Sequence, residues 1–233
     1  MEHTRVDRAD ASALGDAFPY LHGTAISPSR GFYQAFGKRV FDIVLALLAL
    51  PTIVPVVGLL WLMVKRSKGP GFYGHMRVGR NGKPFRCWKL RTMEVNAEEK
   101  LKVYLAENPT AAAEWARDRK LRNDPRVTRI GRFLRKTSLD ELPQIWNVLK
   151  GEMSFVGPRP VVRDELDLYG AASWAYLRGR PGVTGLWQIS GRNDVSYERR
   201  VQFDVDYRKT ESLGQDIRIV LGTVAVVIRG TGS

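Results

Sequence analysis

The sequence predicts an α/β protein that is mostly helical, contains one small β-hairpin and carries a membrane helix ahead of a compact domain. An uncharged apolar run covers Ile43 to Val64, an Asn81-Gly82 turn separates two strand-like runs, and helical spacing recurs later in the chain. A chain of 233 residues has room for one domain with appendages. We expect a disordered tail at 1–37, a re-entrant membrane helix hairpin at 38–66, and a cytosolic domain at 67–233 with helices at the membrane interface.

Overall charge and a few residue types narrow the possible functions. The net charge of +13 implies an anionic partner, which is nucleic acid, an anionic membrane surface or a phosphorylated small molecule. The single cysteine, Cys87, excludes an internal disulfide, and its apolar and basic surroundings favour a buried small side chain. Three histidines exclude a histidine-rich zinc site and disfavour a serine triad. The polar segment 1–37 lacks the apolar core of a signal peptide, so we expect it to be disordered.

The apolar run is long enough to cross a membrane, but its middle favours a bend. It contains about 22 residues, and at about 1.5 Å per residue it matches a bilayer core of about 30 Å. Pro51 and Pro55 lie near its centre, where proline removes a helical hydrogen bond and kinks the helix. Each half is then too short to span alone. We therefore expect a re-entrant hairpin whose bend is at these two prolines, with Thr52 available to satisfy a freed carbonyl.

The charges beside this run support the same topology. Positive charge favours the cytoplasmic side of a membrane, and here both flanks are positive. A straight transmembrane helix and a core helix of a soluble domain remain the two alternatives. The flanking basic residues are Lys38 and Arg39 before the run, and Lys65, Arg66 and Lys68 after it.

The remaining chain is predicted to alternate short helices with loops. Phe72 to Arg91 is expected to form the hairpin, and Ile217 to Ile228 an apolar helix that is too short to span, so it is either buried or laid in the membrane interface. Loop-rich segments are expected at Phe155–Arg163 and Arg178–Arg192. The other predicted helices are Glu98–Ala106, Ala111–Leu121, Arg129–Lys136 and Leu139–Leu149, the last ended by Gly151.

An acidic pair, Asp140-Glu141, follows the most basic stretch of the chain, Arg117 to Lys136. Nearby positive charge lowers the pKa of a carboxyl group, so we expect both to be ionised. An ionised carboxylate among cations can hold a divalent metal or attack phosphorus. The alternative is structural: Ser138 and Glu141 have the spacing of a capping box, in which Glu141 caps a helix and Asp140 complements the helix dipole.

Five sequence blocks, from Lys38 to the C-terminus, resemble the bacterial sugar transferases, the monotopic phosphoglycosyl transferases. The short length and the segment 193–197 look most like the galactosyl-phosphate transferases that initiate exopolysaccharide units. The blocks are Lys38-Arg39-Val40-Phe41-Asp42, Lys89-Leu90-Arg91-Thr92-Met93, the stretch from Asp124-Pro125-Arg126 to Leu142-Pro143-Gln144, Gly151-Glu152-Met153-Ser154-Phe155-Val156-Gly157-Pro158-Arg159-Pro160, and Arg180 to Asn193.

The resemblance implies a reaction and a site. Such enzymes transfer a sugar-1-phosphate from a UDP-sugar to undecaprenyl phosphate and release UMP. Asp140 matches the nucleophile that forms a covalent phosphosugar intermediate, and Glu141 matches its partner. Mg²⁺ is the implied cofactor, held by Asp140 and Glu141. The residues expected to bind substrate are Lys89, Arg91, Arg135, Pro158, Arg159, Pro160, Gln188 and Arg192.

The resemblance also implies a location, partners and one departure from the family pattern. The chain is expected at the cytoplasmic face of the inner membrane, with UDP-sugar, undecaprenyl phosphate and anionic lipids as partners and no nucleic acid. A homodimer stays open, and galactose is preferred over glucose as the sugar. The family breaks its membrane helix at a Ser-Pro pair; here Pro55 matches the proline, whereas Val54 replaces the serine.

Two other functions remain as alternatives. The charge of the chain permits a nucleic-acid-binding module, although the long apolar run speaks against it. A non-catalytic adaptor of a glycan-assembly complex is the second alternative. The presence of Asp140, Glu141, Arg135 and Arg159 argues against a relative that has lost its activity.

Overall fold

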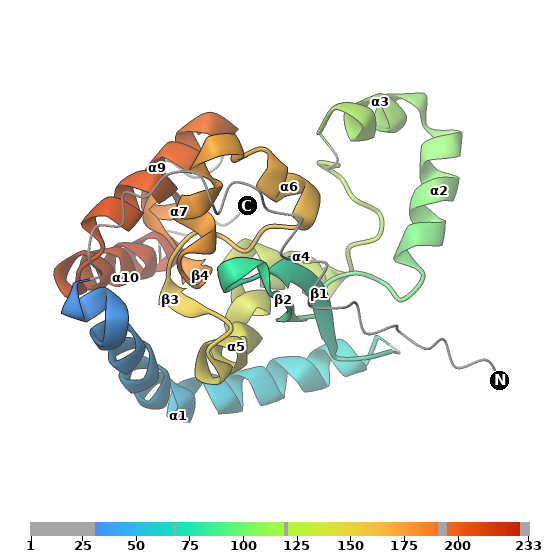
Figure 1. Cartoon of the computed structure of the whole chain (residues 1–233). Helices are drawn as coiled ribbons and strands as arrows, with labels where there is room; N and C mark the ends of the chain where they lie inside the picture. The colour runs from blue at the N-terminus through green and yellow to red at the C-terminus, as the bar shows by residue number, and fades with distance from the viewer. Residues whose placement is uncertain (1–30, 68, 119–120, 191–194, 229–233) are drawn as a thin grey trace.

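A computed structural model describes residues 31–67, 69–118, 121–190 and 195–228, in which short helices surround two small sheets (Figure 1). Strands β1 (Phe72–Val78) and β2 (Pro84–Leu90) pair antiparallel and form the predicted hairpin. The 3-10 turn η3 (Arg80–Gly82) joins them, and Asn81 takes the left-handed φ of 57° that such turns require. The predicted mostly helical α/β class is confirmed.

A second sheet was not predicted. Strands β3 (Ser154–Val156) and β4 (Gly182–Thr184) pair in parallel within the two segments that we expected to be loop-rich. Gly157 and Gly182 permit this pairing, since a Cβ on Gly182 would lie 2.2 Å from the backbone nitrogen of Gly157. The close approach presses the loop that follows β3 against the segment that begins at β4.

The predicted long apolar helix is present, and it is bent (Figure 1). The π-helix η2 (Tyr33–Gly37) leads without a break into α1 (Lys38–Lys65), so part of the predicted tail is helical. The blue first half and the cyan second half of α1 run in different directions (Figure 1), and Pro51 and Pro55 lie inside the helix. Within the described parts of the chain, Tyr33–Lys65 is the helix with the length and hydropathy to cross a membrane, and it is mostly exposed. A helix in a soluble core would be mostly buried.

The N-terminal end of α1 is fixed to the C-terminal helices. The ammonium group of Lys38 donates to Asp216 at 2.5 Å and to Tyr207 at 3.0 Å. Both partners are buried, Tyr207 on α9 (Tyr197–Thr210) and Asp216 on α10 (Leu213–Ile228). One turn on, the carboxylate of Asp42 accepts from Ser154 Oγ at 2.8 Å. Lys38 therefore forms a buried ion pair rather than a contact with lipid headgroups.

The C-terminal end of α1 packs on the same domain. Leu60 and Val64 are buried against Leu90 of β2 and Leu134 of α4 (Arg129–Thr137). Because both ends of the helix contact one compact domain, the two ends lie on the same side of the bend.

The acidic pair lies on a 3-10 turn rather than at the start of an α-helix. Helix α4 ends at Ser138, whose left-handed φ of 56° closes it, and η4 (Leu139–Gln144) follows. The predicted capping box is wrong, because the side chain of Ser138 makes no capping hydrogen bond. The α-helix predicted over 139–149 begins only at α5 (Ile145–Lys150), and Gly151 ends it as predicted, with a φ of 81°.

The other helices match the predictions more closely. Helices α2 (Ala97–Glu107) and α3 (Pro109–Asp118) pack on each other and project from the body (Figure 1). Helix α10 is neither wholly buried nor wholly exposed: Ile219 is buried, whereas Leu221 and Val224 are exposed. The remaining short elements are α6 (Arg163–Asp167), η5 (Gly170–Ala172), α7 (Ser173–Leu177) and α8 (Leu186–Ile189).

Candidate active site

A pocket lies where the hairpin, η4 and the loop after β3 meet. Its wall is rich in cations and amides and includes one carboxylate. Strand pairing explains how the hairpin contributes, because alternate residues of β1 and β2 point to one face. The lining residues are Arg77, Cys87, Lys89, Glu141, Gln144, Arg159, Pro160, Val183 and Gln188.

Asn147 of α5 fixes β2 against the acidic turn. Its side-chain oxygen accepts from the backbone nitrogen of Trp88 at 3.1 Å, and its side-chain nitrogen donates to the carbonyl of Arg86 at 2.8 Å. Asn147 is fully buried, and its amide group satisfies both backbone groups. These bonds hold the strand that carries Lys89 at a fixed distance from Glu141.

Glu141 is ionised and paired. The Nζ of Lys89 donates to its Oε1 at 2.6 Å. Burial alone would raise the pKa of Glu141, but the positive charges of Lys89 and Arg159 outweigh it and hold the pKa below its ordinary value. The expected lowering of the pKa is confirmed for this carboxyl group.

Asp140 behaves differently from its neighbour. It is only 8% exposed, and burial raises its pKa above the ordinary value, although Lys89 and Arg135 oppose the rise. The expectation of a lowered pKa is therefore wrong for Asp140, because desolvation exceeds the attraction of the nearby cations. Asp140 does not form part of the pocket wall, but its chain neighbour Glu141 does, and the charge of Lys89 in the wall acts on Asp140. Two adjacent carboxyl groups thus have opposite shifts in pKa.

Two of the predicted cationic residues lie in different settings. The Nε of Arg135 donates to Thr92 Oγ1 at 3.0 Å, and its charge acts on Asp140. Arg91 is buried away from the pocket wall, and its guanidinium donates to the carbonyl of Pro70 at 2.7 Å and to Ser67 Oγ at 2.9 Å. Its contacts fasten the chain just after α1, so the structure does not bring Arg91 to the other site residues.

The Pro-Arg-Pro segment borders the pocket through two of its three residues. Arg159 and Pro160 line the pocket, whereas Pro158 is buried and its carbonyl accepts from the nitrogen of Gly182 at 2.8 Å. Gln188 also lines the pocket, and its Oε1 is buried without a hydrogen-bond partner. Arg192, the last predicted substrate-binding residue, lies outside the described residues.

Four pocket residues, Arg77, Cys87, Gln144 and Val183, were not predicted as site residues. Arg77 and Cys87 lie on the same face of the hairpin as Lys89, a relationship that strand alternation could have revealed. Gln144 closes the 3-10 turn and is 2% exposed. Cys87 is buried as predicted, and burial raises the pKa of its thiol to about 11, so it is an unreactive part of the wall.

The carboxylates of the acidic pair suit a hard cation only if a bound substrate supplies further oxygen donors. Among the described residues, no group of three or more His, Cys, Asp or Glu side chains gathers to hold a metal ion. Asp140 and Glu141 offer the oxygen donors that Mg²⁺ prefers, and Mg²⁺ commonly takes its remaining ligands from water and substrate phosphates. The donor set therefore fits a magnesium ion that is shared with a phosphorylated substrate.

Comparison with known proteins identifies the family to which the chain is similar. A family profile described as "Bacterial sugar transferase" matches residues 33–230. An undecaprenyl-phosphate galactose phosphotransferase of Salmonella typhimurium is 55% identical over 198 residues, which cover 85% of this chain and 42% of that protein. The exopolysaccharide production protein ExoY of Sinorhizobium fredii is 52% identical, and the match covers 90% of this chain and 91% of ExoY.

A more distant relative is named for the transfer of a different sugar. A UDP-glucose:undecaprenyl-phosphate glucose-1-phosphate transferase of Escherichia coli is 41% identical, over 80% of this chain and 39% of that protein. The chain thus spans about two fifths of the length of the Salmonella and Escherichia relatives and nearly all of ExoY. The family match covers most of the chain, including the hairpin, the acidic turn and the loop after β3. The chain belongs to the bacterial sugar transferase family, whose members are membrane-associated.

Proposed function

We propose that this protein transfers a sugar-1-phosphate from a UDP-sugar to undecaprenyl phosphate in the first membrane step of exopolysaccharide assembly. A carboxylate oxygen of Asp140 attacks the phosphorus that bears the sugar, and the bond from that phosphorus to the bridging oxygen breaks. UMP leaves with the electron pair. An oxygen of undecaprenyl phosphate then attacks the same phosphorus and displaces Asp140, which gives undecaprenyl diphosphate-sugar and the free carboxylate.

The observation that carries this proposal is a buried carboxyl group at the edge of a cation-lined pocket. Lys89 and Arg159 in the wall suit the negative charge of a diphosphate. Asp140 lies beside them with little exposure to water, and its raised pKa makes it a more basic and more nucleophilic oxygen once ionised. Glu141 stays ionised beside it, so the two carboxyl groups are suited to different tasks.

Mg²⁺ is the proposed cofactor. Asp140 and Glu141 are the residues that would hold it, and the bound ion would neutralise charge on the diphosphate. Oε1 of Glu141 is paired with Lys89, so its Oε2 would be the oxygen available to the ion.

Galactose is the proposed sugar. The Salmonella relative, which is named for galactose transfer, is 55% identical to this chain, whereas the Escherichia relative named for glucose transfer is 41% identical. Glucose is the alternative that the test must include. The near full-length match to ExoY supports a role in exopolysaccharide production for a chain of this size.

We also propose that α1 enters the inner membrane from the cytoplasmic face and returns to it. The bend and the packing of both helix ends on one domain support this topology. The exposed apolar residues of α1 would then face lipid. A shallow hairpin keeps the pocket at the headgroup level, where a cytosolic nucleotide sugar and a membrane-bound polyprenyl phosphate can both reach it, next to anionic lipids.

The test is UMP release by the purified protein in vesicles that contain undecaprenyl phosphate and Mg²⁺. A panel of UDP-galactose, UDP-glucose and other UDP-sugars is offered singly. The proposal predicts UMP release that requires the polyprenyl phosphate and is fastest with UDP-galactose. Fastest release with UDP-glucose would overturn the sugar assignment alone, whereas no release with any donor would overturn the proposed reaction.

A further inference from the structure

Arg77 is a pocket residue to which the motifs assign no role. It lies on β1 opposite Phe85, on the face that also presents Cys87 and Lys89. Its nearest ion-pair partner is Glu165, at 3.9 Å between Nη1 and Oε2. That separation is beyond hydrogen-bond distance, and both side chains are partly exposed, so the pairing contributes little. The guanidinium is positioned at the pocket without a strong anionic partner there.

Arg77 adds to the positive charge that the pocket wall offers to an anionic ligand. Arg77, Lys89 and Arg159 supply three cations, and Glu141 supplies one negative charge. The wall therefore carries an excess of positive charge, which suits the negatively charged diphosphate of a nucleoside diphosphate sugar. Arginine is well suited to this contact, since its planar fork donates to two phosphate oxygens at once.

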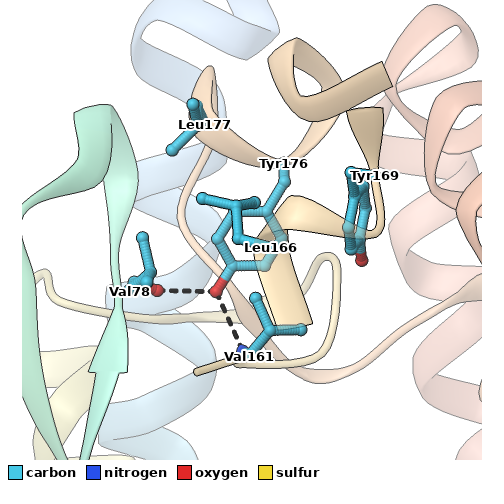
Figure 2. Close-up of a cluster of buried hydrophobic side chains, with 6 residues drawn as sticks. All are labelled: Val78, Val161, Leu166, Tyr169, Tyr176 and Leu177. Carbon is cyan, nitrogen blue, oxygen red and sulfur yellow. Dashed lines mark hydrogen bonds between the residues drawn. The ribbon is translucent and has the colours of Figure 1, made fainter. Parts of the chain in front are cut away.

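One buried tyrosine fixes the strand of Arg77 to the loop of Arg159. The hydroxyl of Tyr176 donates to the carbonyl of Val78 at 2.6 Å and accepts from the nitrogen of Val161 at 3.1 Å (Figure 2). The nitrogen of Val78 also donates to the carbonyl of Val161 at 3.0 Å. Val78 directly follows Arg77, and Val161 follows Pro160, so the hydroxyl clamps the two chains that border the pocket.

The clamp is rigid because its tyrosine is buried on all sides. Tyr176 is 1% exposed and lies in a cluster with Leu166 and Tyr169, whose ring meets its own edge-to-face at 5.6 Å (Figure 2). Its hydroxyl therefore sets the spacing of two backbones rather than filling space. A phenylalanine at this position would keep the ring packing and lose only the two hydrogen bonds.

We infer that Arg77 binds the donor diphosphate together with Lys89 and Arg159, and that Tyr176 is the positioning residue that sets the distance between Arg77 and Arg159. The inference rests on the proposed function, since it takes UDP-sugar as the ligand. It adds a phosphate-binding residue and a structural device that determines where that residue lies.

The first test compares Arg77→Gln with a matched variant, Arg86→Gln. Arg86 is exposed on the neighbouring strand and points to the opposite face of the hairpin, so both variants lose one positive charge. Binding of UDP and of uridine is measured by calorimetry. Arg77→Gln is expected to weaken UDP binding by about 10- to 100-fold and leave uridine binding unchanged. Arg86→Gln should bind both as the wild type does.

The outcomes separate the two claims. If wild-type protein does not bind UDP, the proposed function fails. If it does bind UDP and Arg77→Gln binds it equally well, the inference about Arg77 is wrong. An equal loss of UDP and uridine binding would also contradict it, because a phosphate contact cannot weaken binding of a ligand without phosphate. Arg77→Lys keeps the positive charge but loses the planar pair of donors, so it is expected to recover part of the affinity. It replaces Arg77→Gln in the test if the glutamine variant does not fold.

The second test is a double-mutant cycle for Tyr176. Tyr176→Phe is expected to weaken UDP binding by about 2- to 10-fold, with a KM for donor that rises more than kcat falls. In the Arg77→Gln background the same substitution should change UDP binding by less than about 2-fold, because the residue that it positions is gone. Effects that simply multiply would show that Tyr176 acts independently of Arg77 and would overturn its positioning role.

Discussion

The Nζ of Lys89 on β2 lies 2.6 Å from Oε1 of Glu141 on η4. This ion pair joins the hairpin to the acidic turn at the wall of the pocket, and the bonds of Asn147 to the same strand hold it in place. Of the positive charges that lower the pKa of Asp140, that of Lys89 has the largest effect. A single lysine therefore influences both carboxyl groups of the pair.

Replacing Lys89 by methionine is expected to raise the pKa of Glu141, because burial would then act with less opposition. As the pH falls, a step that needs ionised Glu141 would then begin to fail at a higher pH than in the wild type. The acidic limb of the kcat/KM profile should therefore shift to higher pH. The loss of a phosphate-binding cation should also lower kcat/KM by about 100-fold or more at neutral pH. Rates of UMP release across acidic and neutral pH measure both effects. Lys83→Met, at the exposed turn of the same hairpin, is the control, and an unshifted limb in Lys89→Met would contradict the assignment.

Asp140→Asn is expected to stabilise the fold at neutral pH while removing activity. Burial raises the pKa of Asp140, so the folded state disfavours its ionised form relative to the unfolded state. For a carboxyl group with a raised pKa, the stability that protonation provides is present at low pH and is lost as pH rises through the folded-state pKa. Asparagine never carries the charge. The Tm of the variant should exceed that of the wild type at neutral pH, and the difference should shrink as pH falls; a lower Tm at neutral pH would contradict the reasoning.

The ion pair of Lys38 with Asp216 is expected to be necessary for stability. Their side chains are 9% and 0% exposed, so removal of one partner leaves an uncompensated buried charge. Lys38→Met should cost about 3–5 kcal/mol of stability, whereas Lys38→Met with Asp216→Leu should cost clearly less. Denaturant unfolding of both variants in detergent measures the difference. An equal cost for the single and the double variant would show that the pair is not what stabilises this junction.

Local sequence signals were sufficient for the elements that local chemistry determines. The Asn81-Gly82 turn predicted the hairpin, and the apolar spacing of Arg129–Lys136 predicted α4. The position of the acidic pair after a basic stretch pointed to the pocket that the structure contains. In each case the signal and the structure lie within a few residues of one another.

Features set by distant residues could not be predicted in this way. Lys38 was interpreted as a membrane flank, but its partner Asp216 lies 178 residues away. Arg91 shares a motif with Lys89, yet it lies beyond the end of β2 at Leu90, where strand alternation no longer determines its direction. The pairing of β3 with β4 depends on contacts between glycines in two separate loops. The raised pKa of Asp140 depends on burial, which the nearby charges alone did not reveal.

Cysteine labelling of intact inverted vesicles tests the topology of α1. Single cysteines are placed at Phe32 and Arg66, which are exposed at the two ends of the helical segment. A re-entrant helix predicts that a membrane-impermeant maleimide reaches both from the cytoplasmic face. Cys87 should remain unlabelled, because it is 3% exposed and the pKa of its thiol is raised to about 11. Labelling of the two positions from opposite faces would show a straight span.

The nucleophilic role of Asp140 is tested most directly by a search for its covalent intermediate. Wild-type protein is incubated with UDP-galactose and Mg²⁺ in the absence of undecaprenyl phosphate and examined by intact-protein mass spectrometry. The account predicts release of about one UMP per protein and a mass increase of one sugar phosphate, located on Asp140. Asp140→Asn should show neither, whereas Glu141→Gln should retain the attachment site. UMP release or a sugar-phosphate adduct in Asp140→Asn equal to the wild type would contradict the central claim.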